Sequence, residues 1–398
     1  MAAKSAHDRN LPQNESKWNA WTARYDVTDL SIHDATLPSA SNISEKQYLL
    51  LQVLWTSRNG RSLDMRRFEL DTWKEKADKL LATFHSWDSY CQSFSNGPIR
   101  EGTFALAKKY QSQAAASREE TFQSNVTISP VANRTRSKMG TTSLEQKMRE
   151  VQLETPTKST GSLEVGNTPG TGDSPFPSPG PEELAHKMYP QTKDEQIVNT
   201  ALVDFLNALS IHFPQASEWT LHRKSLKAAF QSGSFEARTD GYLEDGGSSE
   251  RARALIEVKP MLRKKKLNPI RMQEAAQMVA WIKSDPDLTG ILNRPGRYVA
   301  LFYFRAFCDL ANKPLSRLHI SQDRHQIFIT FADYDSNYIQ YLNNTLPPGS
   351  PRPFLRMHEI GPWNTTVKGD MEEVGSILLA IALRAYSDTN TSNEYRSD

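Results

Sequence analysis

The first third of the chain begins with a polar stretch. After this stretch, apolar residues recur at the spacing of helices. Residues 1–43 are polar and mixed, without periodicity, which predicts an N-terminal tail. Helical patterns of apolar residues then begin near residues 44, 62 and 101. They predict a small helical segment over residues 44–111.

The composition changes over residues 112–190. Ser, Thr, Pro, Gly and Asn dominate there, and large apolar residues become rare. Such a segment cannot bury enough apolar surface to offset the entropy lost on ordering. We therefore expect a disordered linker between the helical segment and the C-terminal half of the chain.

Residues 191–390 combine helical and strand patterns and predict a second folded domain of the α/β (α+β) class. The order of patterns is one helix, three strands, one helix and one strand, followed by a hairpin and further helices. In chain order the predicted elements are a helix from Asp194, strands at Trp219–Phe230, Phe235–Tyr242 and Leu255–Lys259, a helix from Asn268 to Lys283, a strand at Arg297–Phe307, a hairpin of Leu318–Ile320 with Gln326–Phe331, and helices at Asp335–Asn343 and Met371–Tyr386.

The amino-acid composition says more about the cellular location of the protein than about its function. The 398 residues are 38% hydrophobic, and the net charge of +2 by itself indicates no partner. The only cysteines are Cys91 and Cys308, which argues against a disulfide framework and fits a reducing compartment. There is neither a signal-peptide core at the start nor a run of about 20 apolar residues. We expect an intracellular protein, nuclear or cytoplasmic, that is neither secreted nor embedded in a membrane.

The stretch with the clearest chemistry is the strand Leu255–Lys259 and the segment before it. Successive strand residues point to opposite faces, so Glu257 and Lys259 share one face. Turn residues at Asp245–Ser249 predict a hairpin that brings Asp240 close to Glu257. Two carboxylates and a lysine on one face can hold a divalent cation beside a phosphate.

These residues resemble the motif of the PD-(D/E)xK nuclease superfamily, which has a restriction-endonuclease-like fold with an αβββαβ core. The matching segments are Thr239-Asp240-Gly241 and Glu257-Val258-Lys259, with sixteen residues between Asp240 and Glu257. Thr239 stands where the family has its name-giving proline. The resemblance covers about a third of the chain, and a polar tail and linker before such a domain resemble uncharacterised fungal members.

The resemblance also implies roles for individual residues. Asp240 and Glu257 would bind Mg²⁺ (or Mn²⁺), and Lys259 would be the catalytic lysine at the scissile phosphate. Glu195 matches an acidic residue that many members carry in the first helix. Gln277 matches the glutamine of a Q-x-x-x-aromatic pattern on the helix after the third strand, completed here by Trp281.

Basic residues are concentrated around the same strand. Between Arg251 and Lys266 there are seven Lys or Arg residues and one Glu. We expect this basic run to contact the phosphate backbone of nucleic acid, with DNA as the expected partner and with affinity that falls as salt rises. The predicted contact residues are Arg251, Arg253, Arg263, Lys264, Lys265 and Lys266, joined by Arg271 on the next helix.

The leading hypothesis is a metal-dependent nuclease that hydrolyses phosphodiester bonds. One alternative is a catalytically idle nucleic-acid-binding module on the same fold, and another is an interaction protein that acts through its N-terminal helices. Locally, Asp240 could instead form a surface ion pair with Arg251 or Arg253, and Gln277 could lie on a solvated helix face. Glu195 could serve as a charge that the helix dipole favours, and the basic run could be a solvated loop or a nuclear-import signal.

Overall fold

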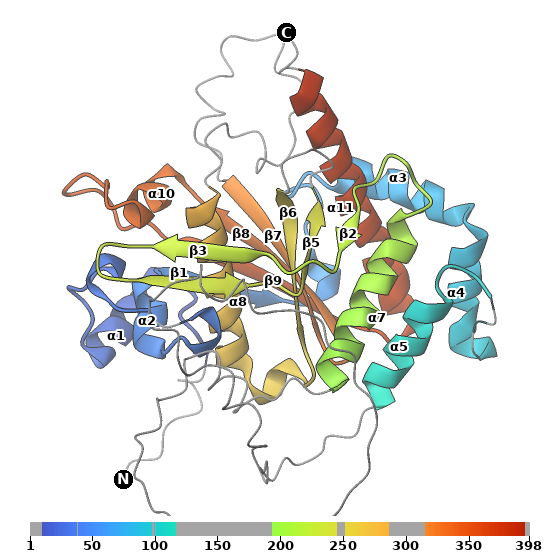
Figure 1. Ribbon diagram of the computed structural model, residues 1–398, viewed down its shortest axis with the longest axis horizontal. Coiled ribbons are helices and arrows are strands. Elements are labelled where there is room, and N and C mark those ends of the chain that lie inside the picture. Colours follow the sequence, from blue (N-terminus) through green and yellow to red (C-terminus); the bar gives the residue numbers. More distant parts are fainter. Residues whose placement is uncertain are drawn as a thin grey trace, which may run out of the picture. The chain divides into compact units, whose positions relative to one another are not determined.

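The computed structural model describes residues 10–37, 39–97, 99, 101–116, 193–244, 251–285 and 315–394, and these belong to one compact unit. The unit has a mixed α/β fold with helices on both faces of a sheet (Figure 1). Nearly all of the predicted linker and the predicted strand Arg297–Phe307 lie outside the described residues.

The sheet has seven strands in the order β1-β9-β8-β7-β6-β5-β2. Their bounds are β1 Val53–Arg58, β2 Trp219–Thr220, β5 Gly241–Glu244, β6 Ala252–Lys259, β7 Leu315–Asp323, β8 Gln326–Tyr334 and β9 Leu355–Asn364. The pairs β1–β9 and β6–β7 are parallel, and the other neighbouring strands are antiparallel. Strand β6, which holds the central motif, is therefore an inner strand between β5 and β7 (Figure 1).

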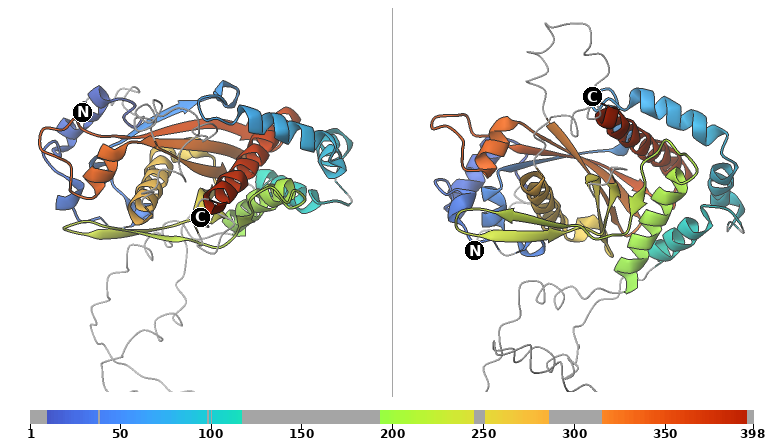
Figure 2. Two further views of the ribbon diagram at one scale, coloured as in Figure 1. Left: turned by 90° about the horizontal axis from the view of Figure 1, so that it is seen from above. Right: turned by 45° about the horizontal axis from the view of Figure 1, so that its top comes forward.

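Helices cover both faces of the sheet, and each face has its own apolar core. The first core lies between the sheet and five helices, α3 Asp71–Ala82, α4 His85–Asn96, α5 Ala105–Ala116, α7 Lys193–Ser210 and α11 Lys368–Glu394. Helices α7 and α11, green and dark red in Figure 2, lie side by side on this face. Alternation along β6 directs Ala254, Ile256 and Val258 into this core, as the sequence predicts for the last two.

The second core contains α8 Leu267–Ser284, together with α1 Glu15–Tyr25, α2 Glu45–Leu50 and α10 Ser336–Leu342. A separate two-stranded ribbon, β3 Ser225–Ala229 and β4 Ser234–Arg238, adds its buried side chains to it. Short 3₁₀ turns occur at Ile32–Asp34, Ala40–Asn42, Gly60–Ser62 and Arg263–Lys265. Helix α8 contacts both the ribbon and strand β7, and it is consequently buried along most of its length.

The N-terminal third differs from its prediction. The polar stretch before residue 44 contains helix α1, whose Trp18 and Trp21 are buried. The apolar run from Tyr48 is helical only to Leu50, and then β1 pairs with β9, about 300 residues further along the chain. A continuous apolar run fits a buried helix and a buried strand equally well, so the pattern did not distinguish them. The sheet thus includes an edge strand from the segment predicted to be helical.

Two predicted strands are each divided in the structure. Trp219–Phe230 forms β2 and β3 with a connection at 221–224, and Phe235–Tyr242 forms β4 and β5 with a break at Thr239-Asp240. Strand β9 was not predicted, since it follows a proline-rich loop and itself contains Pro362. The predicted β5–β6 and β7–β8 pairings and helices α7, α8, α10 and α11 are confirmed. Among the described helices, none has the length and apolar character needed to cross a membrane.

Candidate functional site

Glu257 is held in place by three side chains. Its Oε1 accepts hydrogen bonds from Lys259 Nζ at 2.5 Å and from Gln273 Nε2 at 2.7 Å. Its Oε2 accepts from Gln277 Nε2 at 2.6 Å. The Glu257 side chain is 4% exposed, so these contacts replace most of the hydration of its carboxylate. Strand β6 and helix α8 therefore fix the position of this carboxylate together.

Asp240 lies against the same part of β6, in the break between β4 and β5. Its backbone N–H donates to the Ile256 carbonyl at 2.9 Å, and its Oδ2 accepts from the Val258 N–H at 3.1 Å. Its Oδ1 faces Arg223 Nη2 at 3.4 Å. The ion-pair partner of Asp240 is thus Arg223 and not the Arg251 or Arg253 considered from the sequence.

Helix α7 also contacts Asp240. Asn199 Nδ2 donates to the Asp240 carbonyl at 3.3 Å. Glu195 precedes Asn199 by four residues, so both project from one face of the helix. The charge of Glu195 acts on both Asp240 and Lys259. Glu195 therefore belongs to the cluster, as the resemblance implied.

Gln277 connects the cluster to two further groups. Its Nε2 also donates to the Arg238 carbonyl at 2.9 Å, and its Oε1 lies 3.2 Å from His319 Nε2 on β7. Burial lowers the pKa of His319 to about 4, so the imidazole is neutral at pH 7. When Nε2 of His319 carries the proton and donates it to Gln277 Oε1, both amide hydrogens of Gln277 remain for Glu257 and for the Arg238 carbonyl. Gln277 is buried, not on a solvated face, and His319 was not identified from the sequence.

The charges of the cluster interact strongly. Burial, followed by the negative charge of Glu257, raises the pKa of Asp240 to about 7. Burial by itself would lower the pKa of Lys259, but Glu257, Glu195 and Asp240 raise it above its ordinary value. Lys259 is therefore charged at neutral pH and lies among three acidic side chains.

The donor set suits a hard divalent cation. Asp240 and Glu257 offer carboxylate oxygens, the ligand type that Mg²⁺ prefers. The mutual repulsion that raises the pKa of Asp240 is the interaction that a bound cation relieves. Within the described ranges, no group of three or more His, Cys, Asp or Glu residues is arranged to hold a metal ion. Asp240 and Glu257 are the two carboxylates here that could hold a cation, with water and substrate as its other ligands.

Two members of the predicted nucleic-acid contact set are buried in ion pairs. Arg263 binds Asp323 at 2.6 Å, Glu359 at 2.6 Å and also Glu274. Arg271 donates two hydrogen bonds to Glu359, at 2.6 and 2.9 Å. The prediction that Arg263 and Arg271 contact a phosphate backbone is therefore wrong, because their guanidinium groups neutralise buried carboxylates.

The remaining basic residues lie nearer to solvent. Lys264 and Lys265 are exposed, and Lys266 and Arg251 are partly buried. Arg253 donates to Thr389 Oγ1 on α11 at 3.0 Å. Of the basic run, the two exposed lysines in the turn after β6 are the best placed to contact a polyanion.

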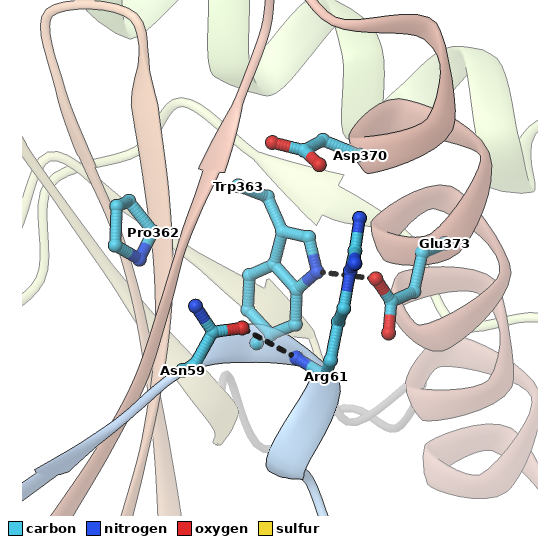
Figure 3. Close-up of a pocket in the computed structure, with 7 residues that line it drawn as sticks. Asn59, Arg61, Pro362, Trp363, Asp370 and Glu373 are labelled. Atoms are coloured by element: carbon cyan, nitrogen blue, oxygen red, sulfur yellow. Dashed lines mark hydrogen bonds between the residues drawn. The ribbon is translucent and has the colours of Figure 1, made fainter.

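A small pocket of about 170 Å³ lies elsewhere, between the end of β1, strand β9 and helix α11 (Figure 3). Trp363 Nε1 donates there to Glu373 Oε2 at 3.2 Å, and the Arg61 backbone N–H donates to Asn59 Oδ1 at 3.1 Å. None of the residues predicted to form the site lines this pocket. Because it lies apart from the cluster of Asp240, Glu257 and Lys259, we do not regard it as the functional site.

Comparison of the chain with models of protein families, with curated proteins and with solved structures finds no match. Its function must therefore be inferred from the side chains of the cluster themselves.

Proposed function

We propose that this chain is a metal-dependent nuclease that hydrolyses phosphodiester bonds of nucleic acid, with a PD-(D/E)xK-type site. The observation that supports it best is the contact of Asp240 with β6 directly beside Glu257, whose carboxylate binds Lys259 at 2.5 Å. A carboxylate from the break before β5 and one from β6 thus form one cluster of the composition that the chemistry needs. Glu195 and Gln277 extend it with the two residues that the resemblance adds.

The order of elements supports a restriction-endonuclease-like core. Helix α7 precedes the antiparallel strands β5 and β6, and α8 then leads to β7, which is parallel to β6. Asp240 directly precedes β5 and Glu257 lies on β6. Gln273 and Gln277 lie on α8, the helix that connects β6 to β7. This order is compatible with the αβββαβ core that the resemblance implies, with β7 as its last strand, whereas the strand predicted for that place, Arg297–Phe307, lies outside the described residues.

Each side chain has a distinct task in the proposed reaction. Asp240 and Glu257 would hold Mg²⁺ (or Mn²⁺), which when bound neutralises developing charge and lowers the pKa of a water ligand. Lys259 remains protonated and stabilises negative charge on the phosphate. Gln273 and Gln277 orient Glu257, and they do so from a buried helix that cannot easily shift.

The expected substrate is DNA, and the expected location is intracellular, nuclear or cytoplasmic. Lys264 and Lys265 are the exposed cations nearest in sequence to the strand that holds Glu257 and Lys259. Contacts of these lysines with phosphates would make binding weaker as salt concentration rises.

One observation favours an alternative, a nuclease-fold module that binds nucleic acid without cleaving it. Cations of the protein itself already contact both carboxylates, Lys259 at Glu257 and Arg223 at Asp240. If these pairs persisted in solution, no divalent cation would enter.

The experiment is a substrate panel with the full chain. Linear duplex, supercoiled and single-stranded DNA and an RNA of the same sequence are incubated with Mg²⁺, Mn²⁺ or a chelator, beside Glu257→Gln purified in parallel. The proposal predicts cleavage that requires the divalent cation and is lost in the variant. Salt-sensitive binding that the chelator leaves unchanged, without cleavage, would instead establish the binding module.

A further inference from the structure

The connection between β2 and β3 is fixed directly beside the cluster. The Thr239 N–H donates to the Lys224 carbonyl at 3.2 Å, and Thr239 Oγ1 accepts from the Lys224 N–H at 3.1 Å. Thr239 is buried and immediately precedes Asp240. A threonine at the position of the family's proline thus anchors the backbone next to Arg223, which proline could not do because it lacks a hydroxyl and an N–H.

Arg223 extends from solvent to the buried carboxylate of Asp240. The side chain of Arg223 is 51% exposed, whereas that of Asp240 is 11% exposed. Their N–O distance of 3.4 Å is longer than that of a strong charge-assisted hydrogen bond, which is about 2.7–2.9 Å. An exposed guanidinium held at this distance can leave the carboxylate when a divalent cation takes its place, because the incoming cation then compensates the buried charge of Asp240.

We infer that Arg223 is a substrate-binding residue that exchanges Asp240 for a phosphate of the nucleic acid when a divalent cation binds. In the structure its guanidinium faces Asp240 Oδ1. A cation at Asp240 repels the guanidinium, which then lies at the solvent side of the site with its planar donors available. Guanidinium donors match two phosphate oxygens at once, so the released group binds the phosphodiester. This inference rests on the proposed function.

The exchange predicts effects of opposite sign on two ligands. Loss of Arg223 removes a competitor of the cation at Asp240, so cation binding becomes tighter. It also removes a phosphate contact, so nucleic-acid binding becomes weaker. A residue that only supported the local fold would weaken both or neither.

The test measures both affinities on the full chain. Mn²⁺ binding is followed by the electron paramagnetic resonance signal of free Mn²⁺, and binding of a labelled DNA duplex is followed by fluorescence anisotropy with Ca²⁺ as a cation. Arg223→Ala is compared with wild type, with the charge-retaining Arg223→Lys and with Arg66→Ala, an exposed arginine in another part of the chain. Thermal melts verify that each variant is folded.

We expect Arg223→Ala to lower the Mn²⁺ Kd several-fold and to raise the DNA Kd by about tenfold, the effect of one charge-assisted hydrogen bond. Arg223→Lys should lie between, and Arg66→Ala should resemble wild type. Values for Arg223→Ala within twofold of wild type, or weaker Mn²⁺ binding, would overturn the inference while leaving the nuclease proposal intact. A wild-type chain that binds neither Mn²⁺ nor DNA would overturn both.

Discussion

Replacing Arg263 by methionine should destabilise the protein strongly. Arg263 is 3% exposed, and its partners Glu274, Asp323 and Glu359 are exposed by 0, 0 and 2%. Glu359 keeps the two hydrogen bonds from Arg271, but Glu274 and Asp323 lose their contacts with the guanidinium. Breaking a buried ion pair costs about 3–5 kcal/mol because the remaining charge stays desolvated. We expect a loss in this range, equivalent to a fall in Tm of roughly 10 °C.

The assay is urea unfolding of the full chain, followed by tryptophan fluorescence at pH 7.5 and at pH 5.5. Lys264→Met is the matched control, since Lys264 is the exposed next residue of the same turn. Burial raises the pKa of Asp323 to about 6, and removal of a neighbouring cation raises it further. Because the folded variant binds protons more tightly than the unfolded chain, its stability falls as pH rises. The loss should therefore be smaller at pH 5.5.

A loss below about 1 kcal/mol, the size expected of an exposed pair, would refute this reasoning. Two other results would do the same: a loss for Lys264→Met as large as that for Arg263→Met, or an equal loss for Arg263→Met at both pH values.

Three further predictions concern the cluster. Asp240→Asn should raise the melting temperature of the chelator-treated protein at pH 8 and not at pH 4. The reason is that the pKa of the Asp240 carboxyl rises from 3.8 to about 7 on folding, so wild type loses stability as pH rises across that range. Wild type should lose stability as pH falls from 6.5 to about 4, because in this range the imidazole of His319 binds a proton in the unfolded chain but not in the folded one. His319→Gln should reduce this loss, and melting temperatures of both proteins measured across the pH range test it. Gln277→Met should lower kcat about tenfold or more, with the DNA Kd within twofold of wild type, since Gln277 orients Glu257 rather than contacting the backbone of DNA. A larger effect on the DNA Kd than on kcat would contradict that role.

The centre of the cluster could be predicted from local rules. Strand alternation gave Glu257 and Lys259 a common face, and turn chemistry brought Asp240 beside them. Gln277 and Glu195 were identified from the resemblance. His319 was identified neither from local rules nor from the resemblance, because a buried histidine on a predicted strand has no distinctive spacing. Its role depends on β7 lying next to β6, a long-range pairing.

The errors share one physical origin. A run of basic residues looks exposed until its counter-ions are known. Two of the three counter-ions of Arg263, Asp323 and Glu359, lie 60 and 96 residues further along the chain. The edge strand β1 likewise depends on β9, on which nothing near residue 53 gives information. Local patterns predicted elements and short-range contacts, whereas burial and sheet edges depended on distant partners.

The most direct test of the account compares cleavage by wild type, Lys259→Gln and Lys264→Gln under one saturating Mg²⁺ concentration. Lys259 is bound to Glu257 within the cluster, and Lys264 is an exposed lysine five residues later. The account predicts that Lys259→Gln lowers the cleavage rate about 10²–10³-fold, as expected for loss of a preorganised charge at the transition state. Lys264→Gln should alter mainly the salt dependence of binding. Equal rates for wild type and Lys259→Gln would contradict the assignment of Asp240, Glu257 and Lys259 as a nuclease site.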